Sequence, residues 1–294
     1  MKIDTHQHYW RYAAEDFPWI SRSMPALQKD CLPGDVLPAL QAAGVDGVLA
    51  VQARSCGDET DYLLALAQTH PHILGVVGWT DLCAANLGET LDRYAEQPLL
   101  KGFRHILQDE PQLPAFIRSP NFSLGVTALQ KRGLVYDLLV FDRQISSVLD
   151  FCARHGNYWL VLDHVGKPCI RDWANKSEVP GRWLASLRAL ASMPHVVCKL
   201  SGLVTEADWE LGNGPLPQDT NIVLECFDRA LDLFGPKRIL YGSDWPVCQL
   251  AAPYDAVHGV AQRWAHTRLT DEEQNAFWAG NASRCYDLKL TNAV

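Results

Sequence analysis

Two histidines close to the start of the chain, His6 and His8, are two residues apart, a spacing that suits metal binding or proton transfer. The first ten residues read MKIDTHQHYW and contain Asp4, His6 and His8. Because side chains alternate between the two faces of a strand, a strand here would point all three the same way. Two imidazoles in adjacent layers suit metal binding or proton transfer. The alternative is a frayed terminus or an expression remnant, and residues on other strands must decide between the two.

Eight short apolar runs alternate with amphipathic segments and predict the elements that would carry such partners. The expected strands cover residues 3–9, 47–53, 73–81, 99–106, 134–140, 160–165, 196–201 and 238–243. The expected helices cover 33–43, 58–69, 86–96, 119–131, 142–154, 181–192, 218–233 and 253–264, with a last one at 270–278. Apolar residues recur with helical spacing in the longer segments, as at Val36, Leu37 and Leu40.

This alternation predicts an α/β fold, a (β/α)8 TIM barrel that forms a single domain over residues 1–294. An open doubly wound sheet is the competing architecture, but no Gly-x-Gly-x-x-Gly follows the first expected strand. No change of composition marks a domain boundary. Residues 212–217 are interpreted as an insertion after the seventh strand that could lie over a pocket.

In a barrel, the carboxyl ends of the strands share the rim where active sites lie. Besides His6 and His8, the sixth expected strand ends in His164 and the eighth in Asp244. Three imidazoles and a carboxylate match the ligands of one divalent cation, Zn or Mn, with an open position for water. The same four residues could also work without metal, with Asp244 and His164 deprotonating water directly.

Five motifs, in this order along the chain, resemble the amidohydrolase superfamily. They are Asp4-Thr5-His6-Gln7-His8, Lys101-Gly102-Phe103-Arg104-His105, Leu162-Asp163-His164-Val165-Gly166-Lys167-Pro168, Gly242-Ser243-Asp244-Trp245-Pro246 and Gly280-Asn281-Ala282. More narrowly, the chain resembles the metal-optional lactonase branch, which includes lactonases of fuconolactone, rhamnonolactone and pyrone dicarboxylate. The resemblance implies hydrolysis of a cyclic ester and a divalent cation that is dispensable.

Two departures from the pattern of the superfamily bear on the metal. Metal-binding members usually carry lysine or glutamate at the end of strand four and histidine at the end of strand five. Here strand four ends in Arg104 and His105, and strand five reads Val135-Tyr136-Asp137-Leu138. At most a mononuclear site of His6, His8, His164 and Asp244 is therefore expected.

Opening a lactone requires a base, support for the oxyanion and an acid. We expect Asp244, oriented by His164 or by a metal, to take the proton of water and return it to the leaving ring oxygen. Arg104 and His105 are expected to stabilise the oxyanion, a contribution of about 3 to 4 kcal/mol for each well-placed donor.

Further side chains next to these motifs are candidates for binding the substrate. Indole faces could stack on a sugar ring, although core packing is the competing interpretation for each indole. Polar side chains after strands two and seven could bind hydroxyl or anionic groups. The candidates are Trp10, Arg54, Trp79, Lys199, Ser201 and Trp245.

Composition limits the partners. A net charge of −8, a pI near 5.6 and the lack of a basic run argue against binding to nucleic acid or an anionic membrane. No apolar run approaches the ~18 residues of a membrane span. Nine scattered cysteines without a Cys-x-x-Cys predict reduced thiols and a cytoplasmic protein. A neutral small-molecule sugar lactone is the expected partner, and a homo-oligomer is left open.

Three functions are consistent with these residues. The first is a sugar lactonase acting on an aldonolactone such as L-fucono-1,5-lactone or L-rhamnonolactone. The second is a metal-dependent decarboxylase of an aromatic or enoic acid on the same barrel. The third is a sugar-binding barrel without catalysis, which would not require four convergent titratable groups.

Overall fold

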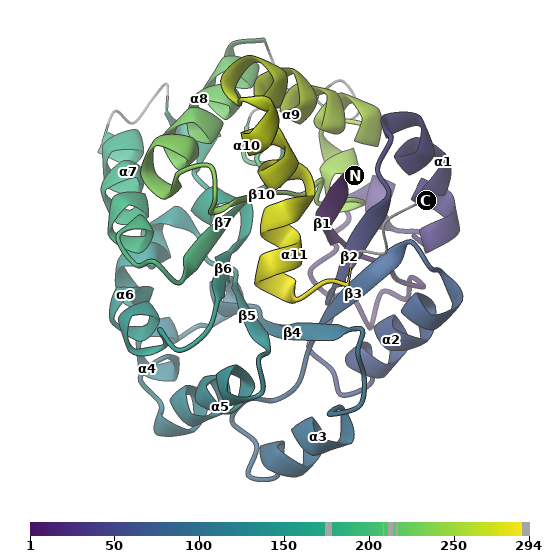
Figure 1. Ribbon diagram of the computed structural model, residues 1–294, viewed down its shortest axis with the longest axis vertical. Helices are drawn as coiled ribbons and strands as arrows, with labels where there is room; N and C mark the ends of the chain where they lie inside the picture. The colour runs from purple at the N-terminus through teal and green to yellow at the C-terminus, as the bar shows by residue number, and fades with distance from the viewer. Residues whose placement is uncertain (174–177, 208, 211–213, 216, 290–294) are drawn as a thin grey trace.

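The computed structural model describes residues 1–173, 178–207, 209–210, 214–215 and 217–289 (Figure 1). Eight parallel strands form one sheet in the order β1-β2-β3-β4-β5-β6-β7-β10. They are β1 Ile3–Gln7, β2 Gly47–Val51, β3 Ile73–Gly78, β4 Leu100–His105, β5 Val135–Leu138, β6 Leu160–Leu162, β7 Val196–Leu200 and β10 Ile239–Tyr241.

The first and last strands of the sheet meet just beyond their carboxyl ends. Gln7 and Trp245 form an isolated parallel β-bridge. The amide of His8 donates to the carbonyl of Trp245 at 2.7 Å, and the amide of Asp244 donates to the carbonyl of His6 at 2.9 Å. These contacts nearly close the sheet, which confirms the predicted TIM barrel rather than an open sheet.

Helices surround the barrel (Figure 1). The larger ones are α1 Pro33–Ala43, α2 Glu59–Thr69, α3 Leu87–Arg93, α5 Pro120–Lys131, α6 Ile145–Arg154, α7 Glu178–Ala191, α8 Pro217–Phe234 and α9 Tyr254–Arg268. The shorter ones are α4 Leu113–Phe116, α10 Asp271–Asn275 and α11 Asn281–Tyr286. Half of the insertion predicted at 212–217, residues 212, 213 and 216, lies outside the described residues. Within the described part, β9 Gly214–Pro215 pairs antiparallel with β8 Trp209–Glu210.

The apolar core has two parts, one between the strands and the surrounding helices and one inside the barrel. Strands buried on both faces read as continuous apolar runs, which is why they stand out in the sequence. The C-terminal segment covers one end of the inner part. Figure 1 shows α11 lying across this end, which faces the viewer. Its members include Ile3, Val51, Val135, Val197 and Leu240 from the strands and Ala282, Cys285 and Tyr286 from α11.

The first strand departs from simple alternation. Its register against β2 shifts between Asp4 and Gln7. As a result, Asp4 accepts hydrogen bonds from the amide of Ser243 at 2.8 Å and from the hydroxyl of Tyr254 of α9 at 3.3 Å. His6 instead faces the barrel interior. The prediction that Asp4 shares a face with the two histidines is therefore wrong.

No helix among the described residues combines the length and apolarity needed to cross a membrane. All nine cysteines are free thiols, as predicted.

Candidate active site

One carboxylate oxygen lies among three imidazoles at the carboxyl rim of the barrel. Asp244 Oδ1 is 3.4 Å from His8 Nε2, 3.8 Å from His6 Nε2 and 3.9 Å from His164 Nε2. All four side chains are buried, and three of them also line a large cavity. The structure thus brings together the four residues that the strand ends suggested.

Unusual backbone geometry aims two of these side chains. Asp244 and His164 have φ values of 62° and 55°, in the left-handed region that non-glycine residues rarely adopt. β6 accordingly ends at Leu162, two residues before His164. Gly202, after β7, allows the His164 ring to sit where it does, because a Cβ at Gly202 would lie 2.4 Å from His164 Nδ1. Strain of this kind clusters at functional sites.

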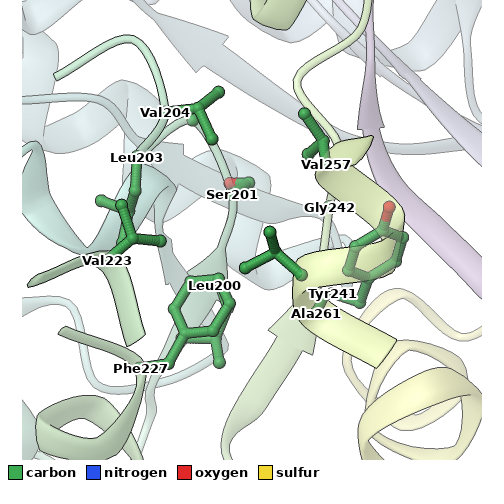
Figure 2. Close-up of a pocket in the computed structure, with 12 residues that line it drawn as sticks. Leu200, Ser201, Leu203, Val204, Val223, Phe227, Tyr241, Gly242, Val257 and Ala261 are labelled. Atoms are coloured by element: carbon green, nitrogen blue, oxygen red, sulfur yellow. The ribbon is translucent and has the colours of Figure 1, made fainter. Parts of the chain in front are cut away.

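A second set of hydrogen bonds orients the imidazoles. His8 Nδ1 lies 2.9 Å from the carbonyl oxygen of Val51, and His164 Nδ1 lies 2.9 Å from Ser201 Oγ. A carbonyl only accepts, so Nδ1 of His8 carries a proton and its Nε2 faces Asp244. Ser201 also borders a small apolar cavity of about 20 Å³ behind the site, and Figure 2 shows it there with Leu200 and Phe227.

Below the imidazoles, two buried cations and two buried carboxylates fill the barrel. Arg104 Nη1 donates to Asp163 Oδ2 at 3.0 Å, and Lys199 Nζ donates to Asp137 Oδ2 at 2.5 Å. Lys199 Nζ also lies 3.2 Å from Asp163 Oδ1. The opposite charges thus share one network, which offsets the cost of removing each from water.

His6 lies above this network, and each of its ring nitrogens is near one cation and one carboxylate. Its Nδ1 is 3.3 Å from Asp163 Oδ1 and 3.2 Å from Lys199 Nζ. Its Nε2 is 3.2 Å from Arg104 Nη1 and 3.8 Å from Asp244 Oδ1. The hydrogen bonds to His6 come from two cations, Lys199 at Nδ1 and Arg104 at Nε2. A neutral imidazole carries one proton, so it can accept from only one of them.

Burial and charge set the protonation states. Burial lowers the pKa of His6 well below its usual value and that of His164 to about 4, so both rings are neutral near pH 7. Burial alone would raise the pKa of Asp163, but Lys199, His6 and Arg104 hold it well below the usual value. Burial opposes ionisation of Asp244 too, yet the surrounding imidazoles lower its pKa. Asp244 is therefore a carboxylate at neutral pH.

The donor set fits a single divalent cation. His6, His8 and Asp244 each offer a ligand atom, and these atoms lie within 4.8 Å of one another. Two ligands about 2.1 Å from a tetrahedral Zn lie about 3.4 Å apart, close to the distance between His8 and Asp244. His8 Nε2 and Asp244 Oδ1 lie 3.4 Å apart, so both atoms could ligate the same cation.

A cavity of about 700 Å³ opens above Asp244. One part of its wall is polar, since Lys167 Nζ donates to Gln108 Oε1 at 3.2 Å and pairs with Glu206 Oε1 at 3.3 Å. Apolar side chains form much of the rest. They include Trp19, Met24, Ile106, Leu139, Phe141, Val247 and Leu250.

Arg104 and His105 lie on opposite sides of β4, although both were expected at the oxyanion. Arg104 borders the cavity. His105 pairs with Glu110 Oε1 at 2.6 Å and stacks on Phe116, outside the residues that line the cavity. Alternation along the strand explains the difference, because consecutive side chains point to opposite faces.

The six expected substrate-binding side chains do not line the cavity. Lys199 and Ser201 lie beneath the imidazoles instead. Arg54 pairs with Glu59 and Asp16.

The three expected indoles are likewise absent from the cavity wall. Trp10 donates to the carbonyl of Lys29 and packs on Trp19, and Trp245 packs on Tyr9. Trp79 binds Thr60 through its backbone. The indoles of Trp10 and Trp245 therefore contact aromatic neighbours, which is the competing interpretation for these two.

Several residues of the site were missed from sequence. Asp163 and Lys167 belong to the motif around His164, which was a usable signal. Trp19 lies in the long connection after β1, and Glu206 lies beyond β7. Nothing in their spacing marks these two.

The chain is similar to known proteins over nearly its whole length. Residues 3–288 match the family model described as amidohydrolase. The L-fucono-1,5-lactonase of Burkholderia multivorans is 49% identical over 288 residues, covering 98% of this chain and 96% of that protein. The L-fucono-1,5-lactonase of Burkholderia ambifaria is 33% identical over 291 residues, with coverage of 98% and 96%.

A solved structure supports the same assignment. The crystal structure of an amidohydrolase from Burkholderia multivorans with bound Zn has a TM-score of 0.94 and 49% identity, and the match covers 98% of this chain and 100% of that one. The family match extends from the first strand to the last helix, and it agrees with the barrel fold and with the histidines and aspartate at its rim. The chain belongs to the amidohydrolase family.

Proposed function

We propose that the protein is a lactonase, a hydrolase of carbohydrate metabolism that opens an aldonolactone such as L-fucono-1,5-lactone or L-rhamnonolactone to the aldonic acid. The observation that carries the proposal is the ionised Asp244, set among three imidazoles on the floor of a cavity. The two relatives named L-fucono-1,5-lactonase support the substrate class.

Asp244 serves as base and then as acid. It takes a proton from water while the water oxygen bonds to the lactone carbonyl carbon, and the carbonyl electron pair moves to the oxygen. When the tetrahedral intermediate collapses, the bond to the ring oxygen breaks and that oxygen receives the proton from Asp244. The net reaction adds one water across the ester bond, and Asp244 returns to a carboxylate.

Arg104 is the candidate for stabilising the oxyanion. It borders the cavity and is held rigidly, since Nε donates to Gln52 Oε1 at 2.8 Å and Nη2 donates to the carbonyl of Gln52 at 2.6 Å. A donor fixed in this way is worth about 3 to 4 kcal/mol to the transition state. We leave His105 out of the mechanism because of its position.

A divalent cation, Zn or Mn, would be held by His6, His8 and Asp244, with His164 beside them. When bound, it supplies Lewis-acid chemistry that polarises an ester carbonyl. We propose that it is dispensable, because Arg104 already places a positive charge 3.2 Å from His6 Nε2.

The cavity walls suit a sugar lactone. Gln108, Lys167 and Glu206 offer donors and acceptors for hydroxyl groups. Trp19 and Phe141 offer flat apolar surface for the carbon face of a ring.

A pH-indicator screen tests the proposal. Purified protein is mixed with a panel of aldonolactones, with and without EDTA, and proton release is followed. Release from a sugar lactone that survives EDTA is expected. No turnover of any lactone, together with carbon dioxide release from an aromatic acid, would replace the lactonase by a decarboxylase.

A further inference from the structure

The seam of the barrel, where β1 meets β10, is joined largely by side chains (Figure 1). In the described part of the chain, the only strand pairing across this seam is the isolated bridge between Gln7 and Trp245. Lower down, the hydroxyl of Thr5 donates to the carbonyl of Tyr241 at 2.6 Å. Side chains thus supply hydrogen bonds that a backbone ladder supplies between the other strands.

Asp4 makes the second side-chain connection across the seam. It is fully buried, and its Oδ1 accepts from the amide of Ser243 at 2.8 Å and from the amide of His6 at 3.2 Å. Its Oδ2 accepts from Gln7 Nε2 at 2.7 Å and from the hydroxyl of Tyr254 at 3.3 Å. A single oxygen therefore ties the end of β1 to the segment that follows β10.

The segment that Asp4 holds carries the proposed base. Ser243 directly precedes Asp244, whose φ is 62°. Two consecutive amides are bound to β1, since that of Ser243 donates to Asp4 and that of Asp244 donates to the carbonyl of His6 at 2.9 Å. A residue with positive φ keeps this conformation only where its surroundings impose it. The direction of the Asp244 carboxylate therefore depends on these two hydrogen bonds.

We propose that Asp4 is a positioning residue that aims the Asp244 carboxylate, and that it acts as a hydrogen-bond acceptor rather than through its charge. Both backbone amides share Oδ1, and the side chain of asparagine offers an oxygen at the same place. The partners of Oδ2 are adaptable, because the Gln7 amide can turn over and the Tyr254 hydroxyl can rotate. Asp4 does not line the cavity, so its effect falls on the rate rather than on substrate binding.

The test separates position from charge in the full chain. Asp4→Asn keeps an oxygen in place without the charge, whereas Asp4→Glu keeps the charge and moves the oxygens by one methylene. Asp4→Ala removes the acceptor and is the second variant if Asp4→Glu does not fold. Asp228→Ala is the control, because it also removes the acceptor of a buried donor, the Trp264 indole at 2.9 Å, and neither residue lines the cavity.

The kinetic arm rests on the proposed lactonase activity, with kcat referred to the folded fraction of each variant. We expect Asp4→Glu and Asp4→Ala to lower kcat by about 10- to 100-fold with little change in KM, as loss of an outer hydrogen bond commonly does. Asp4→Asn and Asp228→Ala should keep kcat within about threefold. Wild-type kcat in Asp4→Glu and Asp4→Ala, or a loss in Asp4→Asn as large as theirs, would overturn the inference.

Amide hydrogen exchange, followed by NMR, needs no substrate. The amide of Ser243 should exchange slowly in the wild type and in Asp4→Asn, and at least about tenfold faster in Asp4→Glu and Asp4→Ala. An unchanged exchange rate at Ser243 in all variants would also overturn the inference. If the wild type opens no lactone, the proposed function fails, while the exchange rates still decide whether Asp4 holds the backbone beside Asp244.

Discussion

Gly202 offers a sharp test of how tightly the site is built. A Cβ at this position would lie 2.4 Å from His164 Nδ1 and 2.7 Å from Cγ, whereas ordinary contact begins at 3.4 Å. Gly202 also has a φ of +63°. In Gly202→Ala, an alanine in the left-handed backbone region would cost about 1 to 2 kcal/mol of stability. Its Cβ would also displace the His164 imidazole by about 1 Å.

A displacement of that size has a predictable kinetic effect. Misplacement of a reacting group by about 1 Å can lower the rate on the order of 100-fold. We expect Gly202→Ala to lower kcat for the lactone by about that factor, measured by indicator assay at saturating substrate. Its free energy of unfolding in urea should fall by about 1 to 3 kcal/mol.

Gly235→Ala is the matched control. Gly235 has a φ of +72°, but nothing lies within 4 Å of the position of its Cβ. This variant should lose a similar backbone contribution to stability and keep its activity. If both variants kept wild-type kcat, the tight packing of Gly202 against His164 would have no part in catalysis.

Three further predictions concern the framework. His155 is buried against Phe151, and burial lowers its pKa from 6.5 to about 4. Between pH 6.5 and 4, therefore, His155 binds a proton in the unfolded chain but not in the folded chain. The free energy of unfolding should fall as the pH drops from about 6.5 to 4, and less steeply in His155→Gln; equal slopes in urea titrations would contradict this. Val223→Ile should stabilise the protein by about 0.8 kcal/mol by filling the small cavity in Figure 2, whereas Val148→Ile, which is buried away from it, should destabilise. Arg104→Met leaves Asp163 with one cation fewer and should cost about 3 kcal/mol or more in urea unfolding; a loss below about 1 kcal/mol would show that the pair contributes little.

The barrel could be predicted from sequence because its signal is repeated. Strands buried on both faces give apolar runs, and eight of them alternate with helices of helical periodicity. In a barrel the carboxyl ends of all strands lie at the same rim. The sequence alone therefore allowed four residues to be grouped in one site: His6, His8, His164 and Asp244. Their catalytic and metal-binding roles stay predictions.

Local geometry limited the rest. The register shift in β1 turned Asp4 away from the histidines, and such shifts leave no mark in an alternating pattern. Trp245 follows a rim residue directly yet packs against Tyr9, so a position next to a rim residue in sequence does not by itself place a side chain in the cavity. The cavity wall depends on side chains from long connections, such as Trp19, and these connections have no period to read.

The role of Asp244 as the base is tested most directly by the kcat of Asp244→Asn on the best aldonolactone substrate. An amide keeps the shape of the side chain but cannot take a proton from water. Asp109→Asn is the control, since Asp109 lines the same cavity and is exposed. We expect kcat to fall by at least about 100-fold in Asp244→Asn and to change little in the control. Near wild-type kcat in Asp244→Asn would contradict the assignment of the base and, with it, the mechanism.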